Sequence, residues 1–250
     1  SPASQVGFRP MAAVSGARRS TGEDIVLADG SKFSENYRGE HNPRNASVSN
    51  LQPEENCALW VTNLPEDCTH HELLSHIRNL GRIWCVVINK PDYVIHTTAA
   101  AKVVFFRPRP AQAFLAASLT RGIHVRGRRI KVAHNRVKYE ASHITGNESR
   151  VLIITGSSSF VNEKSLTDFF KQRFVFEVDE ITTLIKTSTR TCLEYKFGSY
   201  RCQAAMGKLS LEMDRPEGLE KVEYGLDPCE VGETMSSYGV AGERIQGHGI

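Results

Sequence analysis

The feature that most constrains this chain is an order of strands and helices that occurs twice along it. Residues 56–138 and residues 150–230 each contain a strand pattern, a helix pattern, two strand patterns, a second helix pattern and a final strand pattern. This β-α-β-β-α-β order within about 80 residues is typical of the ferredoxin-like split arrangement, a four-stranded antiparallel sheet with two helices on one face. The repeat therefore predicts an α+β chain with two such domains, each leaving one sheet face open.

Short-range signals delimit the elements of the first copy. Thr69, with Glu72 three residues later, forms a capping-box pattern, and the apolar positions that follow keep helical spacing until Gly81. A second helix is expected to begin at Pro110 and to reach Leu119. Strands are expected at residues 59–64, 83–88, 99–106 and 127–133.

The second copy follows the same order with weaker local signals. Asn162 is expected to cap a helix that carries Leu166, Phe169 and Phe170, and a second helix is expected at residues 201–211. Strands are expected at residues 150–154, 176–185, 191–197 and 222–224.

Three segments lie outside the two copies. Residues 1–55 are rich in Ser, Gly, Ala, Asn and Arg without sustained periodicity, which is typical of a disordered arm. Residues 139–149 form a linker whose length would let the domains either pack or swing. Residues 231–250 are expected to be a flexible tail.

The charge of the chain is divided unequally between the two copies. Residues 57–138 hold 13 Lys and Arg against 4 Asp and Glu, a balance of +9, whereas residues 150–230 hold 11 against 13, a balance of −2. A basic domain beside a slightly acidic one indicates two different electrostatic partners. Only the first domain is expected to approach a polyanion.

Other features narrow the class of protein. The six cysteines form no C-x-x-C pair, which favours reduced thiols in an intracellular protein over disulfides or a zinc site. No run of about 18 apolar residues occurs, so no membrane span is expected. The chain also lacks nucleophile-elbow, phosphate-loop, metalloprotease and deaminase signatures, so we expect neither catalytic residues nor a metal, a cofactor or a small-molecule substrate.

The first strand of the first copy places an aromatic ring on the open face of the sheet. Side chains alternate along a strand, so Leu59 and Val61 point to the core while Trp60 and Thr62 point outward. The last strand alternates basic and aliphatic residues, which places Arg129 and Lys131 on the outward side. Asn135 and Arg136 extend this basic strip beyond the end of the strand.

Residues 56–65, 96–106 and 197–202 resemble the RNA recognition motif (RRM) family, and residues 59–64 resemble its RNP2 motif. The resemblance implies that Trp60 stacks on a base and that Lys102 lies beside it on the neighbouring strand. The family's other motif, RNP1, carries rings at two positions that are Ala100 and Lys102 here. The first domain therefore keeps one of three family rings, and its RNA-binding residues are predicted to be Trp60, Thr62, Lys102, Arg129, Lys131, Asn135 and Arg136.

The second domain departs further from the RRM pattern. Its corresponding positions are Ile153, Cys192 and Glu194, so it offers no stacking ring and places a carboxylate in mid-sheet. We interpret it as a degenerate RRM that packs against the first domain or a protein partner. The tandem pair is similar to divergent RRM-containing proteins of filamentous fungi, which implies RNA binding without a known target.

Two functional hypotheses follow, and each has a structural alternative; for the second domain, the alternative is that it simply stabilises the chain. The first is a non-catalytic protein that binds single-stranded RNA through the basic sheet face of the first RRM. The second is an adaptor that binds proteins through degenerate RRM folds. The basic face could instead be an ordinary solvated surface, and Trp60 could be covered by the linker or by a C-terminal segment.

Overall fold

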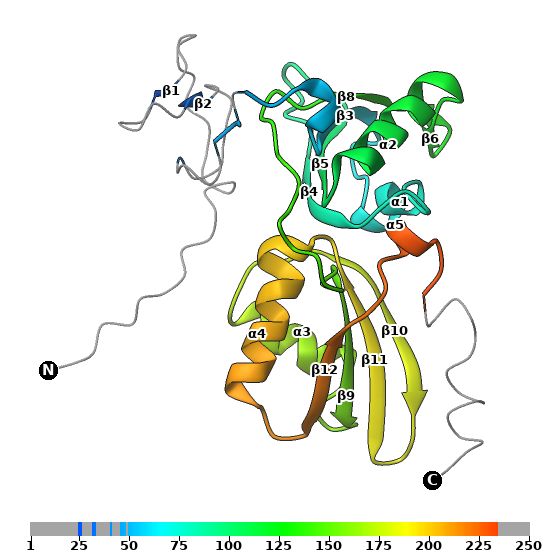
Figure 1. The fold of residues 1–250 in the computed structure, drawn as a ribbon. Helices are drawn as coiled ribbons and strands as arrows, with labels where there is room; N and C mark the ends of the chain where they lie inside the picture. Colours follow the sequence, from blue (N-terminus) through cyan, green and yellow to red (C-terminus); the bar gives the residue numbers. More distant parts are fainter. Residues whose placement is uncertain (1–24, 27–31, 34–40, 42–45, 49, 235–250) are drawn as a thin grey trace, which may run out of the picture.

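The computed structural model describes residues 25–26, 32–33, 41, 46–48 and 50–234, so most of the expected arm and tail lies outside the described residues. Two four-stranded antiparallel sheets dominate it, one in each half of the chain, and each is backed by helices (Figure 1). The predicted α+β class with two ferredoxin-like sheets is confirmed. No helix among the described residues is both long and apolar enough to cross a membrane.

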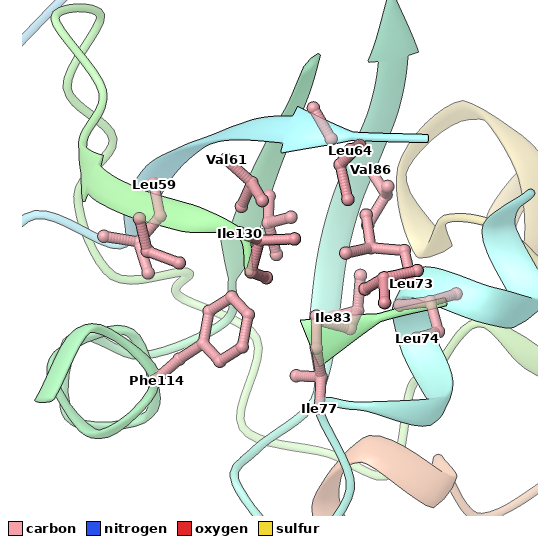
Figure 2. Packing of buried hydrophobic residues seen from close by; sticks show 14 of the residues in the cluster. Leu59, Val61, Leu64, Leu73, Leu74, Ile77, Ile83, Val86, Phe114 and Ile130 are labelled. Atoms are coloured by element: carbon pink, nitrogen blue, oxygen red, sulfur yellow. The ribbon is translucent and has the colours of Figure 1, made fainter. Parts of the chain in front are cut away.

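The sheet of the first domain has the strand order β4-β5-β3-β8, with β5 and β3 in the centre. Its elements are β3 (Ala58–Leu64), α1 (His70–Ser75), β4 (Ile83–Asn89), β5 (Ala99–Phe105), α2 (Pro108–Thr120) and β8 (Lys131–His134). Leu59 and Val61 are fully buried, whereas Trp60 and Thr62 are partly exposed, as the alternation predicted. Phe114 of α2 points toward Leu59, Val61 and Ile130 in the core between sheet and helices (Figure 2).

Tertiary contacts shorten the first helix relative to its periodicity. The capping box is confirmed: Thr69 Oγ1 accepts from the Glu72 amide, and Glu72 Oε2 accepts from the Thr69 amide. However, α1 ends at Ser75 rather than near Gly81. The amides of Leu80 and Gly81 donate to the carbonyl of Cys229 at 2.7 and 2.8 Å, so a distant segment satisfies the backbone there.

Two further boundaries differ from the expected ones. Helix α2 begins at Pro108 rather than Pro110, because either proline suits the first turn of a helix. The expected strand at residues 127–133 is divided. Its first part, β7 (Arg128–Arg129), pairs with β6 (His124–Val125) in a two-stranded ribbon, and only β8 joins the main sheet.

The sheet of the second domain has the equivalent order β10-β11-β9-β12. Its elements are β9 (Val151–Ser157), α3 (Glu163–Lys171), β10 (Val178–Lys186), β11 (Arg190–Phe197), an irregular kinked segment η3 (Tyr200–Ala204), α4 (Ala205–Asp214) and β12 (Leu219–Tyr224). Asn162 caps α3 as predicted, since its side chain accepts from the Ser165 amide at 2.9 Å. The rings of Phe170, Tyr195 and Phe197 lie in one aromatic core.

After β12 the chain returns to the first domain and forms α5 (Pro228–Val231), which lies next to α1 (Figure 1). Cys229 of this helix is fully buried and belongs to the hydrophobic core of the first domain. The expected boundary between second domain and tail, at residue 231, therefore falls inside α5.

A buried charge network lies where the domains meet. Arg150, the largest fully buried side chain, donates to Asp227 at 3.0 Å, to Asp179 at 2.7 Å and to the carbonyl of Phe197 at 2.8 Å. His71 Nδ1, from α1 of the first domain, lies 2.8 Å from the other oxygen of Asp179. Burial by itself disfavours the charged form of Arg150, but the carboxylates of Asp227 and Asp179 hold its pKa above the ordinary value.

The free edge of β4 receives groups from the second domain. The hydroxyl of Ser199 accepts from the Val86 amide at 2.8 Å and donates to the Val86 carbonyl at 3.1 Å. Asp227 Oδ2 accepts from the Ile83 amide at 2.9 Å. The length of the linker would let the two domains either pack against each other or swing freely, and in the structure they pack.

Three short elements precede the first domain. Strands β1 (Ile25–Val26) and β2 (Lys32–Phe33) pair with each other, and η2 (Pro53–Glu55) is a single 3-10 turn. The carbonyl of Pro53 accepts from Gln112 on α2 at 3.0 Å, which fixes η2 on the first domain.

Candidate nucleic-acid interface

The face of the first sheet opposite its helices is divided into an open and a covered half. In the open half, Trp60 lies across from Lys102 on β5 and from Ala133 on β8, and Thr62 lies across from Lys131. These residues are neighbours because the register places them on adjacent strands, about 5 Å apart. The structure therefore brings together four of the seven predicted residues: Trp60, Thr62, Lys102 and Lys131.

The covered half lies toward the start of β3. Ala58 and Val104 are buried there, against Tyr139 and Ala141 of the linker. Since Ala58 and Val104 point to the same face as Trp60, the linker covers one end of the face that the sequence predicted to bind RNA.

Two further rings on this face were missed by the sequence analysis. Trp84 of β4 and Phe106, which follows β5, lie 5.1 Å apart between centroids, and each lies 5.2 Å from the ring of Tyr200 in the second domain. Alternation from Val104 places Phe106 outward, so the sequence held that signal. Trp84 points outward because of a register shift between Ile83 and Cys85, whereas strict alternation from the buried Val86 would have placed it in the core. Their engagement with Tyr200 makes them part of the domain contact rather than a stacking surface.

Tyr139 marks the border between the two halves. Its hydroxyl accepts from Arg201 of the second domain at 3.1 Å, and Lys102 Nζ lies 5.5 Å from the centre of its ring. A cation at this distance is attracted to the face of the ring. The amino group of Lys102, whose backbone lies across from Trp60, is thus held near the Tyr139 ring.

The cations of the first domain fall into paired and unpaired groups. Arg126 pairs with Asp67 and Glu72, and Arg82 pairs with Glu230. Lys131, Arg129 and Arg136 are exposed, and no carboxylate of the described residues forms an ion pair with them.

The other three predicted residues lie away from the open half. Arg129 is in the β6–β7 ribbon, and its side chain packs close to Gly122. Asn135 and Arg136 follow β8 at the covered end, where the Asn135 amide donates to the Ala58 carbonyl. The side chain of Asn135 accepts from the Val137 amide at 3.2 Å, and the carbonyl of Arg136 accepts from Ser47 at 3.3 Å.

The loop between β4 and β5 is fixed by one carboxylate. Asp92 accepts from the amides of Val94, Ile95 and His96 at 2.9 to 3.0 Å, and these bonds lower its pKa to about 2. The loop presents Tyr93, which is 66% exposed, at the open end of the sheet.

The equivalent face of the second domain carries a buried ion pair. Glu194 in mid-sheet is fully buried, lies 3.0 Å from Lys196 and accepts from the hydroxyl of Thr234 at 3.1 Å. Lys196 also pairs with Glu180 at 2.7 Å. The mid-sheet carboxylate that the sequence analysis singled out is thus paired with a lysine and bonded to Thr234 of the C-terminal segment.

Comparison with known proteins gives structural matches only. No protein-family model matches the chain, and no curated protein matches it. The Sex-lethal protein–RNA complex matches with 22% identity and a TM-score of 0.28 over 68% of this chain and 99% of that one. The first two RRM domains of yeast Pub1 match with 15% identity and a TM-score of 0.27 over 67% of this chain and 98% of that one.

A single-domain structure is similar as well. The third RRM domain of Mip6 matches with 23% identity and a TM-score of 0.28, over 34% of this chain and 98% of that one. The assignment of the fold rests on the strand order and the helix placement of each domain. On that basis, the chain is similar in fold to tandem RRM structures.

Proposed function

We propose that the protein is a non-catalytic RNA-binding protein that binds single-stranded RNA through the open half of the first sheet. The observation that carries the proposal is the position of Trp60, partly exposed between Lys102 on β5 and the β8 strand that carries Lys131. Proteins that bind single strands combine aromatic rings, on which bases stack, with cations that track the phosphates. Both components lie within this half.

Charge supports the same proposal. Lys131 has no ion-pair partner among the described carboxylates, so phosphates need not displace an internal partner to reach it. The second domain differs because its central Glu194 and Lys196 pair with each other. We therefore assign RNA binding to the first domain and a structural role to the second sheet.

The size of the open half limits the bound RNA. Tyr139, Trp84 and Tyr200 occupy the other half, and one indole remains as the stacking platform. A single base stack contributes about 1 to 3 kcal/mol, so the affinity is expected to depend mainly on phosphate contacts and hence on salt.

A salt titration with labelled single-stranded RNA tests the proposal. Trp60→Ala is expected to weaken binding by about 1 to 3 kcal/mol at every salt concentration, because a stack carries no charge. Lys131→Glu is expected to weaken binding and to lower the slope of affinity against salt by about 0.7 or more, because a phosphate contact is lost. Lys186→Glu, an exposed lysine on β10 of the second domain, is the matched control.

Two results would contradict the proposal. Binding that ignores ionic strength would exclude phosphate contacts. Binding unchanged in the Trp60→Ala, Lys131→Glu double variant would place the RNA elsewhere.

The second candidate function is an adaptor that binds a protein through the second domain. It is favoured by Leu209 and Met213 on α4, which are 47% and 73% exposed and lie four residues apart on one helix face. Absence of RNA binding by the wild-type chain, with saturable protein binding that Met213→Glu abolishes, would favour this alternative.

A further inference from the structure

The β6–β7 ribbon stands beside the open end of the first sheet. Its turn places Arg126 and Gly127 at positive φ, 47° and 74°, which is typical of the tight turn that joins two hairpin strands. Val125 is almost fully buried and anchors the ribbon in the core of the domain. The ribbon is therefore a structured hairpin that is anchored in the core of the domain, not an irregular surface loop.

One arginine of the ribbon, Arg126, fixes the ribbon to the rest of the domain through hydrogen bonds to carboxylates. Arg126 donates to Asp67 and to Glu72, each at 2.7 Å. Hydrogen bonds from Arg126 lower the pKa of Glu72 to about 2, so this carboxylate stays charged at neutral pH. These contacts fix the turn on the N-terminus of α1.

The neighbouring arginines have no ion-pair partner among the described carboxylates. Arg128 and Arg129 are exposed, as is Arg121 at the end of α2, and none of them forms an ion pair with a carboxylate of the described residues. The two carboxylates that the turn contacts, Asp67 and Glu72, are bound to Arg126. The ribbon therefore presents uncompensated positive charge on a fixed backbone.

The register connects the ribbon to the proposed RNA site. Along β3, Thr62 lies across from Lys131, and the next residue, Asn63, donates from its side chain to the carbonyl of Arg129 at 2.7 Å. The cations therefore continue from the sheet face onto the ribbon. At the opposite end of the sheet, Tyr139 and Tyr200 cover the surface, so the ribbon lies at the end of the open half that these two rings leave uncovered.

We propose that the β6–β7 ribbon, with Arg128, Arg129 and Arg121, is a second phosphate-binding site for the nucleotides that flank those on the sheet. This inference rests on the proposed function, since the flanking nucleotides belong to the same single-stranded RNA. It assigns to the ribbon the backbone of the RNA and not its bases, because the ribbon offers guanidinium groups that match phosphate oxygens, and its ring is the imidazole of His124 rather than a Phe, Tyr or Trp.

The test compares short and long oligouridylates by fluorescence anisotropy. An RNA of about 4 nucleotides is expected to occupy the sheet alone, whereas one of about 12 nucleotides is expected to reach the ribbon. The Arg128→Ser, Arg129→Ser variant should bind the long RNA about 25-fold more weakly at 0.1 M salt, because each phosphate contact contributes a factor of about 5 there. Its affinity for the short RNA should be unchanged.

Two controls keep the result interpretable. Lys171→Ser, Lys186→Ser removes two exposed cations of the second domain and should leave both affinities unchanged. Arg128→Lys, Arg129→Lys keeps the charge and should retain most of the binding to the long RNA. Circular dichroism melting verifies that each variant is folded.

The outcomes separate this inference from the proposed function. Equal loss for both RNAs, or no loss for either, overturns the ribbon site while binding that depends on Trp60 still supports the sheet. Failure of the wild-type chain to bind either RNA overturns both.

Discussion

A single buried arginine shows how charge is used at the domain junction. Arg150 comes from the start of β9, and its partner Asp227 comes from the segment between β12 and α5. Both side chains are almost completely shielded from water, so each charge is stabilised chiefly by the other and by Asp179. Removing one partner leaves the other as an uncompensated buried charge.

We expect Arg150→Met to lower the free energy of unfolding by about 3 to 5 kcal/mol, because two carboxylates lose their buried partner. Urea denaturation followed by circular dichroism measures the change. Lys164→Met is the control, since Lys164 and its partner Asp168 are exposed, and it should give no measurable change. Equal stability of the two variants would show that the buried network contributes nothing.

At the scale of elements, β4 shows how a sheet edge is protected. A strand at the edge of a sheet leaves amides and carbonyls without partners, which invites pairing with other chains. Here the hydroxyl of Ser199 accepts a hydrogen bond from the Val86 amide and donates one to the Val86 carbonyl, and the carboxylate of Asp227 accepts one from the Ile83 amide. The second domain therefore provides hydrogen-bond partners for backbone groups of an edge strand, which in many sheets are left to solvent.

Ser199→Ala is expected to destabilise the protein by about 1 to 3 kcal/mol, because the buried amide of Val86 loses its acceptor. Thermal unfolding of this variant is to be compared with that of Ser188→Ala, which changes an exposed serine in the β10–β11 turn. Hydrogen exchange of the Val86 amide should accelerate in the first variant alone. Unchanged exchange there would argue against the bond.

At the scale of the whole molecule, the C-terminal segment joins the two domains. It completes the core of the first domain with Cys229, supplies Asp227 to Arg150 and places Thr234 over Glu194 of the second sheet. The interdomain contact and the covered half of the first sheet's open face therefore belong to one arrangement.

Removal of residues 227–250 is expected to uncouple the domains. Calorimetry should then show two unfolding transitions instead of one, and small-angle scattering should show a larger radius of gyration. A chain ending at Thr234 keeps every contact named above and should retain the single transition. One transition in both truncated chains would mean that the linker and η3 contacts alone couple the domains.

The sequence by itself determined the elements and their faces. The capping box at Thr69, the Asn162 cap and the alternation around Trp60 are signals between residues that are close along the chain, and the structure has each of them. Because a repeated order of such elements has few ways to bury its apolar faces, the two sheets followed as well. The ring on the face of the first sheet and the excess of positive charge were also readable from the sequence.

Only the tertiary structure decided which part of that face remains open. No local pattern in the sequence marks Tyr139, Tyr200 or Cys229. In the structure, Tyr139 covers Ala58, Tyr200 packs on Trp84, and Cys229 fills the core beneath α1. Their roles arise from contacts between segments that lie far apart in the chain, whose formation depends on how two complete domains pack. Local patterns record which side of a strand a residue occupies, whereas domain packing determines what lies against that side.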